Sequence, residues 1–183
     1  MRKRLYIDLD GTLARFHDEL HYLTRMYDKG FFENLRPFQN MVMAVKFFIH
    51  CYPDIEVSIL SSVVPTEYCC AEKVRWVKRH LPEVHTVILV PEGMEKSDFV
   101  PDITRRDILL DDYNHNLESW ARAGGRSVKL VNNINNTGKI GRRWKGEMIY
   151  HDDAPFTICK QLGDIFQYTQ LDFYDVITAG AVV

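Results

Sequence analysis

Apolar runs that end in acidic or hydroxyl side chains most constrain the fold of this 183-residue chain. Residues 5–10, LYIDLD, run into two aspartates, and residues 107–112, DILLDD, end in the same way. A third run, residues 55–65, contains the pair Ser61 and Ser62. Short apolar runs of this kind are typical of strands that are buried on both faces of a parallel sheet. Because ligands bind at the carboxyl ends of parallel strands, these polar groups predict a shared site at one sheet edge.

Helical patterns alternate with the apolar runs. Apolar residues recur at helical spacing in four segments, residues 17–28, 36–52, 66–81 and 116–125. Two further strand patterns cover residues 84–91 and 126–133. This alternation predicts an α/β fold, a Rossmann-like and mainly parallel sheet with helices on both faces. The length predicts a single domain over residues 1–183, with one polar, turn-rich loop at residues 132–146.

The composition excludes several classes of protein. Lys and Arg number 23 against 25 Asp and Glu, a formal net charge of −2, so bulk nucleic-acid binding is not expected. No apolar run approaches the roughly 18 residues that a membrane span needs, and acidic residues arrive where a signal peptide would be apolar. We therefore expect a cytoplasmic protein with no membrane partner. The four cysteines lack a paired metal-site spacing and are expected to be free thiols: Cys51, Cys69, Cys70 and Cys159.

The polar groups at the strand ends form a chemical set. Seven side chains should gather at one edge of a parallel sheet: Asp8, Asp10, Ser61, Ser62, Lys96, Asp111 and Asp112. Several converging carboxylates repel one another and need a hard divalent cation, and carboxylate and water ligands suit Mg²⁺. A hydroxyl and an ammonium group beside the metal can bind the oxygens of a phosphoryl group. The set predicts phosphoryl chemistry.

The order of these residues resembles the haloacid dehalogenase superfamily of phosphotransferases. DLDGT matches its first motif, ILSS its second, Lys96 its third and ILLDD its fourth, so the resemblance spans residues 4–132. It implies that Asp8 attacks phosphorus to form an aspartyl-phosphate, while Asp10 protonates the leaving oxygen and then activates water. It also implies Mg²⁺ held by the Asp8 carboxylate, the Asp10 carbonyl and one aspartate of the fourth-motif pair, Asp111 and Asp112.

Three further stretches are similar to the 5'(3')-deoxyribonucleotidases, the cytosolic type C 5'-nucleotidases. They are GFFENLRPFQNMVMAV, KVRWVKRHL and DILLDDYNHNLESW. KVRWVKRHL shows no catalytic need for its particular residues. The resemblance implies a 5'-nucleotidase that dephosphorylates nucleoside monophosphates, with phosphate hydroxyls at Ser61 and Ser62 and a phosphate-binding ammonium at Lys96. The aromatic positions that contact the base in this family fall on Phe16 and Phe32.

The chain departs from this family in three places. Thr12 stands where the family usually has valine, and Ser61 stands where the second motif usually begins with threonine, a change that keeps the hydroxyl. The insertion after the first motif is reduced to residues 15–30, room for one short helix. The expected fold is therefore a haloacid dehalogenase-like core with a minimal helical cap. A reduced cap often goes with a partner subunit or a larger substrate that covers the site, which leaves a homo-oligomer open.

Two alternative functions are open at this stage. A receiver-like phospho-acceptor module also combines acidic groups, a hydroxyl and a lysine around Mg²⁺. In receivers, however, the lysine comes last, whereas here Lys96 precedes Asp111, and Asp10 follows the expected nucleophile by two residues. Within the superfamily, the alternative substrates are another small phosphate, such as a sugar phosphate, and a phosphorylated nucleic-acid end.

Overall fold

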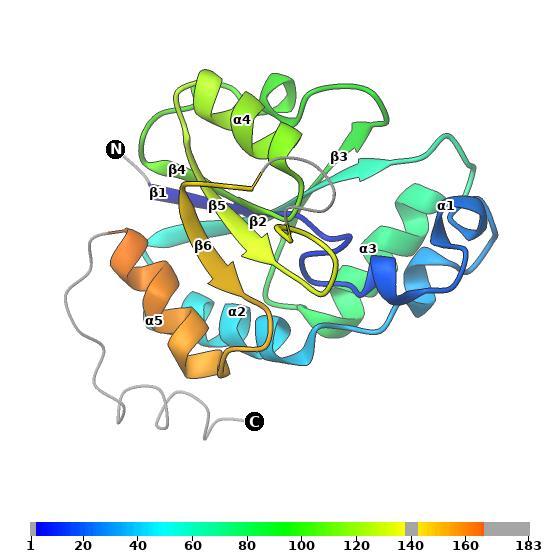
Figure 1. The fold of residues 1–183 in the computed structure, drawn as a ribbon, viewed down its shortest axis with the longest axis horizontal. Helices are drawn as coiled ribbons and strands as arrows, with labels where there is room; N and C mark the ends of the chain where they lie inside the picture. The colour runs from blue at the N-terminus through cyan, green and yellow to red at the C-terminus, as the bar shows by residue number, and fades with distance from the viewer. Residues whose placement is uncertain (1–2, 138–142, 167–183) are drawn as a thin grey trace.

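The computed structural model describes residues 3–137 and 143–166 (Figure 1). Its elements, in chain order, are β1 (Lys3–Ile7), the 3₁₀ helix η1 (Phe16–Asp18), α1 (Tyr22–Arg25), η2 (Phe32–Asn34), α2 (Gln39–Cys51), β2 (Ile55–Val63), α3 (Cys69–His80), β3 (Thr86–Pro91), η3 (Lys96–Phe99), β4 (Asp107–Asp111), α4 (Asn114–Arg122), β5 (Arg126–Val131), β6 (Glu147–Tyr150) and α5 (Pro155–Ile165).

The strands of the described residues form one parallel sheet in the order β3-β2-β1-β4-β5-β6. The chain builds outward from β1 to β3, then crosses back so that β4 pairs with the other side of β1. Ile7 at the end of β1 is in register with Ile59 of β2 and Leu110 of β4. Strands β2 and β3 are added on one side of β1, and β4, β5 and β6 on the other side, so the order of the strands reverses between β1 and β4. A crevice opens at the carboxyl ends of the strands at such a switch point. The predicted α/β fold with a parallel sheet is confirmed.

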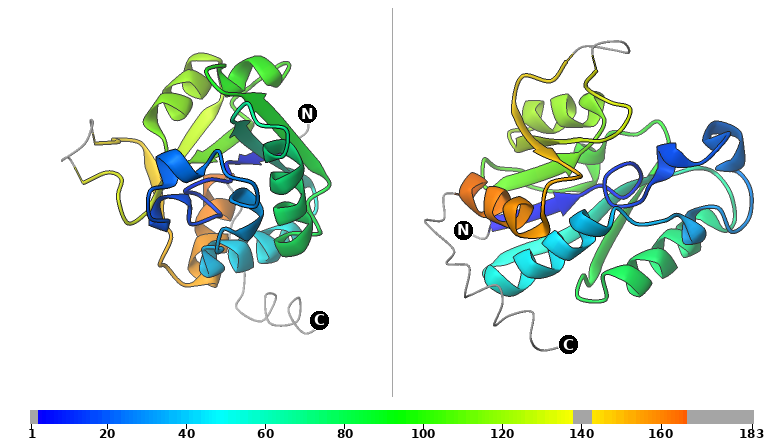
Figure 2. Two further views of the ribbon diagram at one scale, coloured as in Figure 1. Left: turned by 90° about the vertical axis from the view of Figure 1, so that its right-hand side faces the viewer. Right: turned by 60° about the horizontal axis from the view of Figure 1, so that its bottom comes forward.

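Helices cover both faces of the sheet, as the sequence predicts (Figure 1, Figure 2). Leu5 and Ile7 of β1 face the larger core, which also contains side chains of α2, α3 and α5. Tyr6 faces the smaller core beneath α4 and η3, where its ring lies 5.1 Å from that of Trp120. Helices α2 and α5 lie side by side on the larger core (Figure 2). Burial of alternate residues on both faces explains why the strands are continuous apolar runs.

The segment 17–28 does not form the single helix that its apolar spacing predicts. Only α1, residues 22–25, is α-helical, and it follows His21, which adopts the left-handed conformation with φ of 57°. A left-handed residue interrupts the helical hydrogen-bond ladder. Leu20 and Leu23 of the expected apolar stripe are 73% and 65% exposed, so these two side chains add no core packing that would favour a longer helix. The division into one domain with a reduced cap at residues 15–30 stays a prediction.

The segment that follows the cap is anchored to α3 by two buried side chains. The Glu72 carboxylate accepts hydrogen bonds from the backbone N–H groups of Gly30 and Phe32, the latter at 3.1 Å. The Trp76 indole N–H donates to the Leu35 carbonyl at 2.8 Å. Both side chains are almost fully buried, and a buried carboxylate that accepts two N–H groups fixes the loop's path. Residues 30–35 are therefore held in place by α3.

Helix α3 begins three residues later than predicted, and two elements were not predicted. The Thr66 hydroxyl accepts a hydrogen bond from the N–H of Cys69 at 3.2 Å, so Thr66 still satisfies a donor of the first turn. Strand β6 and helix α5 continue the α/β alternation after the loop at residues 132–146, of which residues 138–142 lie outside the described part. None of the four cysteines, all of which lie in the described part of the chain, forms a disulfide. No helix among the described residues is long and apolar enough to span a bilayer.

A buried ion pair fixes the start of β4. The Arg4 guanidinium donates to the Asp107 carboxylate, which also accepts the backbone N–H and the hydroxyl of Thr104 at 2.7 and 2.9 Å. Burial would raise the pKa of Asp107, but the hydrogen bonds from Arg4 and Thr104 outweigh it and hold the pKa below its ordinary value. Asp107 therefore stabilises the fold when it is ionised.

We expect Asp107→Asn to lower the free energy of unfolding at pH 7 by about 2 kcal/mol, because Arg4 loses its charged partner. The stabilisation by Asp107 is complete above the pKa of the unfolded chain, about 4, and is lost as the pH falls through the lower folded value. Urea denaturation at pH 7 and pH 3 should therefore show a difference that shrinks in acid. Asp164→Asn removes an exposed pair with Lys160 and should cost less than about 0.5 kcal/mol. An equal loss of unfolding free energy in both variants would contradict the stabilising role assigned to Asp107.

Candidate active site

The loop after β1 carries Asp8 and Asp10 to the carboxyl edge of the sheet. The Asp8 N–H donates to the Leu110 carbonyl at 2.9 Å, so residue 8 extends the pairing of β1 with β4. The Leu9 carbonyl then accepts three N–H groups from the next turn, at 3.3, 2.9 and 2.8 Å. The backbone of this turn is fixed by its own hydrogen bonds, which places both aspartates beside the end of β4.

Gly11 allows this turn to approach the next loop closely. Its φ is 81°, a conformation that favours glycine. A Cβ atom at this position would lie 2.5 Å from the Asp112 carboxylate and 2.9 Å from the His17 ring. The glycine of DLDGT is therefore required both by backbone conformation and by the space that Asp112 and His17 occupy.

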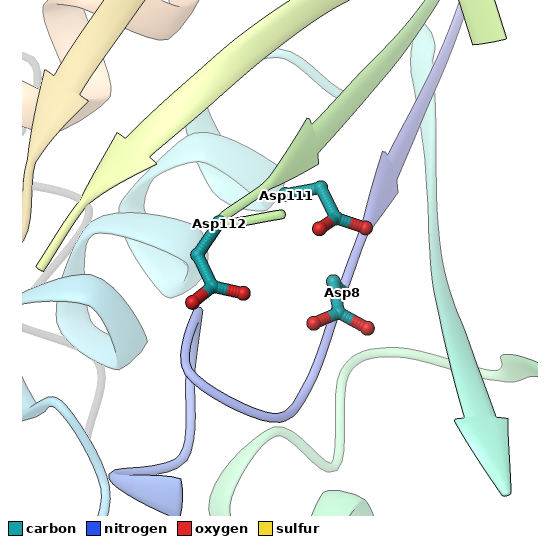
Figure 3. A group of neighbouring side chains, drawn as sticks. All are labelled: Asp8, Asp111 and Asp112. Atoms are coloured by element: carbon teal, nitrogen blue, oxygen red, sulfur yellow. The ribbon is translucent and has the colours of Figure 1, made fainter. Parts of the chain in front are cut away.

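Three carboxylates meet at the ends of β1 and β4 (Figure 3). Asp8, Asp111 and Asp112 each offer an oxygen within 4.8 Å of the oxygens of the other two, and all three side chains are buried. Figure 3 shows that the three carboxyl groups face a common space. Buried like charges at this separation repel one another strongly unless cations accompany them. The predicted metal ligands Asp8, Asp111 and Asp112 are thus brought together.

Lys96 supplies one of these cations. Its ammonium group donates to Asp8 Oδ1 and, at 2.6 Å, to Asp111 Oδ2. The side chain is only 2% exposed. Burial lowers the pKa of Lys96, but attraction to Asp111 and Asp8 outweighs burial and raises the pKa above its ordinary value. Lys96 is therefore a protonated, buried bridge between the first and fourth strands, brought there by η3.

Asp8 remains electrostatically strained despite Lys96. Burial raises its pKa to about 7, Lys96 opposes this shift, and repulsion from Asp111 and Asp10 adds to it. A carboxyl group with a raised folded pKa destabilises the fold when it is ionised. Perturbation of this kind by burial and neighbouring charges is common at functional sites. Asp8 is thus a candidate for chemistry rather than for stability.

The two aspartates of the fourth motif have different surroundings. Asp111 is engaged at both oxygens, because Oδ2 also accepts from the Asn116 amide at 2.9 Å and Oδ1 accepts the N–H of Tyr113 at 2.8 Å. Asp112 Oδ2 accepts from the Asn132 amide at 2.8 Å and lies 3.2 Å from His17 Nε2. Within residues 3–137 and 143–166, no hydrogen bond reaches Asp112 Oδ1. Asp112 therefore keeps one oxygen available to a ligand.

A second buried lysine, Lys73 of α3, binds Asp10 and the two serines of β2. Its ammonium group donates to Asp10 Oδ2, to the Ser61 hydroxyl at 3.0 Å and to the Ser62 carbonyl. Lys73 is 1% exposed. The two aspartates of DLDGT are thus held by different lysines, Asp8 by Lys96 and Asp10 by Lys73.

Asp10 keeps one oxygen without a protein partner. Oδ1 is shielded from solvent, and no donor in the described part of the chain reaches it, whereas Oδ2 is bound by Lys73. A buried polar atom without a partner is uncommon and indicates an absent ligand or water. This oxygen is available to exchange a proton with a bound molecule.

One pocket of about 200 Å³ lies between these carboxylates and the phosphate-binding residues predicted from the sequence. Its lining residues are Asp8, Asp10, Phe16, His17, Ser61, Ser62, Lys96, Asp111, Asp112, Tyr113 and Asn116. The predicted catalytic, phosphate-binding and metal-binding residues are therefore neighbours. Of the two predicted base contacts, Phe16 lines the pocket, whereas Phe32 is 2% exposed and is absent from the lining.

The two phenylalanines pack against each other. Their rings lie 6.2 Å apart and nearly parallel, at 9°. The Lys73 ammonium lies 4.6 Å from the centre of the Phe32 ring, a cation–π contact that covers part of that ring. In this arrangement Phe32 supports Phe16 and Lys73 from the core. The predicted roles of Phe16 and Phe32 in base binding stay predictions.

Comparison with protein families identifies the chain. A family model described as "5' nucleotidase, deoxy (Pyrimidine), cytosolic type C protein" matches residues 14–143. The chain belongs to this family. The match includes the second, third and fourth motifs and confirms the resemblance inferred from the sequence. A comparison with curated proteins found no match.

Solved structures share the fold of this type C 5'-nucleotidase family member. A D,D-heptose 1,7-bisphosphate phosphatase from Burkholderia thailandensis has a TM-score of 0.58 at 13% identity, covering 88% of this chain and 99% of that one. The hydrolase YfnB from Bacillus subtilis, bound to magnesium, has a TM-score of 0.57 at 9% identity, covering 91% and 99%. An L-2-haloacid dehalogenase from Xanthobacter autotrophicus has a TM-score of 0.54 at 10% identity, covering 86% and 98%. Identities this low show the fold alone, and the family adds that the chain is a hydrolase of the haloacid dehalogenase phosphatase type.

The sequence did not reveal several residues of the site. Lys73 lies in KVRWVKRHL, a stretch for which the sequence showed no catalytic need, and the structure places its ammonium group on Asp10 and Ser61. Asn116 and Asn132 hold Asp111 and Asp112. Lys73 follows the buried Glu72 on a helix that ends in basic residues, so spacing alone does not distinguish it from a solvated lysine. The sequence feature that could have identified Lys73 is the similarity of the whole helix to the family.

We expect Lys73→Met to reduce turnover of a chromogenic phosphomonoester by about 10²-fold, the scale for loss of one preorganised charged group. Methionine keeps most of the buried volume but leaves Asp10 and Ser61 without their donor. Lys78→Met changes an exposed lysine of the same helix and should keep turnover within twofold. Thermal unfolding of both variants separates loss of catalysis from loss of fold. Equal turnover of folded Lys73→Met and wild type would show that Lys73 is structural.

Proposed function

We propose that this protein is a magnesium-dependent phosphomonoesterase, a 5'-nucleotidase that dephosphorylates nucleoside monophosphates through an aspartyl-phosphate. One juxtaposition carries the proposal: Asp8, Asp10, the Ser61 hydroxyl and the Lys96 ammonium line the same pocket as the carboxylate pair of the fourth motif. The membership of residues 14–143 in the type C 5'-nucleotidase family supports the nucleotide substrate.

The donor set fits Mg²⁺. Asp8, Asp111 and Asp112 provide hard oxygen donors within 4.8 Å of one another. Asp111 already accepts three hydrogen bonds from protein donors, so we propose that the carboxylates of Asp8 and Asp112 and the carbonyl of Asp10 hold the ion. When bound, Mg²⁺ would neutralise negative charge on the carboxylates and on the phosphoryl oxygens. The aspartates outnumber the lysines that bind their carboxylates, which favours a further cation.

Asp8 is the proposed nucleophile. Its carboxylate oxygen forms a bond to phosphorus while the ester P–O bond breaks, which gives an aspartyl-phosphate and a leaving alcohol. Lys96 binds Asp8 Oδ1 and holds the carboxylate in one orientation. The Asp8 N–H bonded to β4 fixes the backbone of the nucleophile. Attack therefore starts from a residue directly after β1 whose backbone is held by a hydrogen bond to β4.

Asp10 is the proposed acid and base. Its Oδ1, which has no partner among the described residues, would deliver a proton to the leaving oxygen. In the second step the same oxygen takes a proton from water as the water oxygen bonds to phosphorus and the Asp8–phosphorus linkage breaks. Lys73 binds the other oxygen, Oδ2, and thereby orients Oδ1. The products are phosphate and the regenerated carboxylate of Asp8.

Ser61, Ser62 and Lys96 are proposed to bind the phosphoryl group. Ser61 is fully buried at the end of β2, and both serines line the pocket. Their hydroxyl groups can donate to phosphoryl oxygens, and Lys96 adds a positive charge. Phe16, which also lines the pocket, is proposed to contact the nucleoside.

We expect Asp8→Asn to reduce turnover by more than ~10³-fold while the protein stays folded. The amide is nearly isosteric but is a poor nucleophile, and it removes a buried charge that repels Asp111. Acid quenching during turnover, followed by peptide mass spectrometry, should find phosphate on the peptide that contains residue 8 in wild type only. Phosphate on another residue, or turnover within tenfold of wild type, would contradict the covalent assignment.

Chelation should abolish activity, and Mg²⁺ should restore it. We expect Asp112→Asn to raise the Mg²⁺ concentration for half-maximal activity by at least about tenfold, because one direct ligand loses its charge. Asp98→Asn changes an exposed carboxylate of η3 and should leave the magnesium dependence unchanged. The measurement is a magnesium titration of chelator-treated protein with a fixed phosphomonoester. Full activity after complete chelation would refute the metal requirement.

A further inference from the structure

Tyr113 presents a large aromatic ring at the mouth of the catalytic pocket. It follows Asp112 directly, lines the pocket and is 62% exposed. Exposed aromatic residues are common singly on protein surfaces and need no explanation there. An exposed ring that lines a pocket built mostly from charged and polar side chains is a different case, because it offers apolar surface to whatever molecule enters.

The backbone of Tyr113 is fixed although its ring is exposed. Its N–H donates to Asp111 Oδ1 at 2.8 Å, and its carbonyl accepts the N–H of Leu117 in the first turn of α4. The ring of His115 lies 6.0 Å from the Tyr113 ring. A tyrosine has few side-chain torsions, so a fixed backbone leaves little conformational freedom to lose on binding.

The catalytic pocket is too small to enclose a nucleotide. Its volume of about 200 Å³ lies below the roughly 300–1,000 Å³ of sites that enclose small-molecule ligands. A phosphoryl group bound near Asp8 and Lys96 therefore leaves the ring of a nucleotide outside, at the mouth. Phe32 cannot meet that ring without rearrangement, because it is buried and Lys73 lies over it.

We propose that Tyr113 forms an outer subsite that stacks on the planar ring of the leaving group, the nucleobase in the substrate proposed above. Phe16 lines the inner part of the same pocket and Tyr113 its rim. A stacking platform accepts any base, because every base has a flat π-face. Tyr113 therefore favours nucleotides over phosphates that lack a ring and discriminates little among the four bases. This inference rests on the proposed phosphatase activity of the site.

The test compares three substrates: a deoxyribonucleoside monophosphate, 1-naphthyl phosphate and phosphoserine. Tyr113→Ala should raise KM about tenfold for the first two, a scale typical of base stacking, with a smaller effect on kcat and little effect on phosphoserine. Tyr113→Phe should restore KM, because stacking needs the ring and not the hydroxyl. Tyr150→Ala removes another exposed tyrosine, at the end of β6, and should change nothing.

Equal KM changes for all three substrates, or no change for any of them, would overturn the subsite. Failure of the proposed nucleotidase function has a different signature, turnover of 1-naphthyl phosphate and phosphoserine by wild type without turnover of nucleotides. In that case the split in KM between 1-naphthyl phosphate and phosphoserine still decides on Tyr113. If Tyr113→Ala raises KM for 1-naphthyl phosphate but not for phosphoserine, a subsite for planar rings is supported. If the KM values of the two substrates change equally or not at all, the subsite is overturned.

Discussion

The bridge from Lys96 to Asp8 and Asp111 is the interaction on which the site depends. Two carboxylates from adjacent parallel strands are fully buried, and one ammonium group from η3 binds both. Without it, the ends of β1 and β4 would carry uncompensated buried charge, which costs several kcal/mol per group. The crossover that places β4 beside β1 therefore needs the lysine that arrives in the connection just before β4. The pairing of β4 with β1 brings Asp8 and Asp111 together, and Lys96 compensates their charges.

This arrangement stores electrostatic strain that the rest of the fold must support. The raised pKa of Asp8, about 7, means that its ionised form is disfavoured in the folded protein. The strands beneath it are buried on both faces, with Leu5 and Ile7 in one core and Tyr6 in the other. Apolar burial on both faces gives β1 the rigidity to hold a strained carboxylate in place. Strain of this kind can be relieved by a cation that binds among the carboxylates.

Most of the site could be predicted from the sequence because parallel strands end at one edge. Asp8, Ser61 and Asp111 each follow an apolar run, so knowledge of the topology was enough to bring them together. The helix at residues 17–28 could not be predicted correctly, because apolar spacing does not reveal the left-handed His21. Lys73 was missed for a related reason. A lysine on an amphipathic helix is normally solvated, whereas Lys73 is buried between the Phe32 ring and its partners Asp10, Ser61 and Ser62.

Lys96 and Lys73 compensate the negative charges of the two aspartates in DLDGT. Like charges two residues apart on an extended chain would repel, yet each carboxylate meets a different cation from a different element, η3 for Asp8 and α3 for Asp10. Separate partners allow separate roles. Asp8 is held beside Asp111 and Asp112, where a metal can bind, whereas Asp10 binds Lys73 through Oδ2 and its Oδ1 has no partner among the described residues. The same helix, α3, fixes residues 30–35 through Glu72 and Trp76. Helix α3 therefore couples the orientation of Asp10 to the placement of residues 30–35.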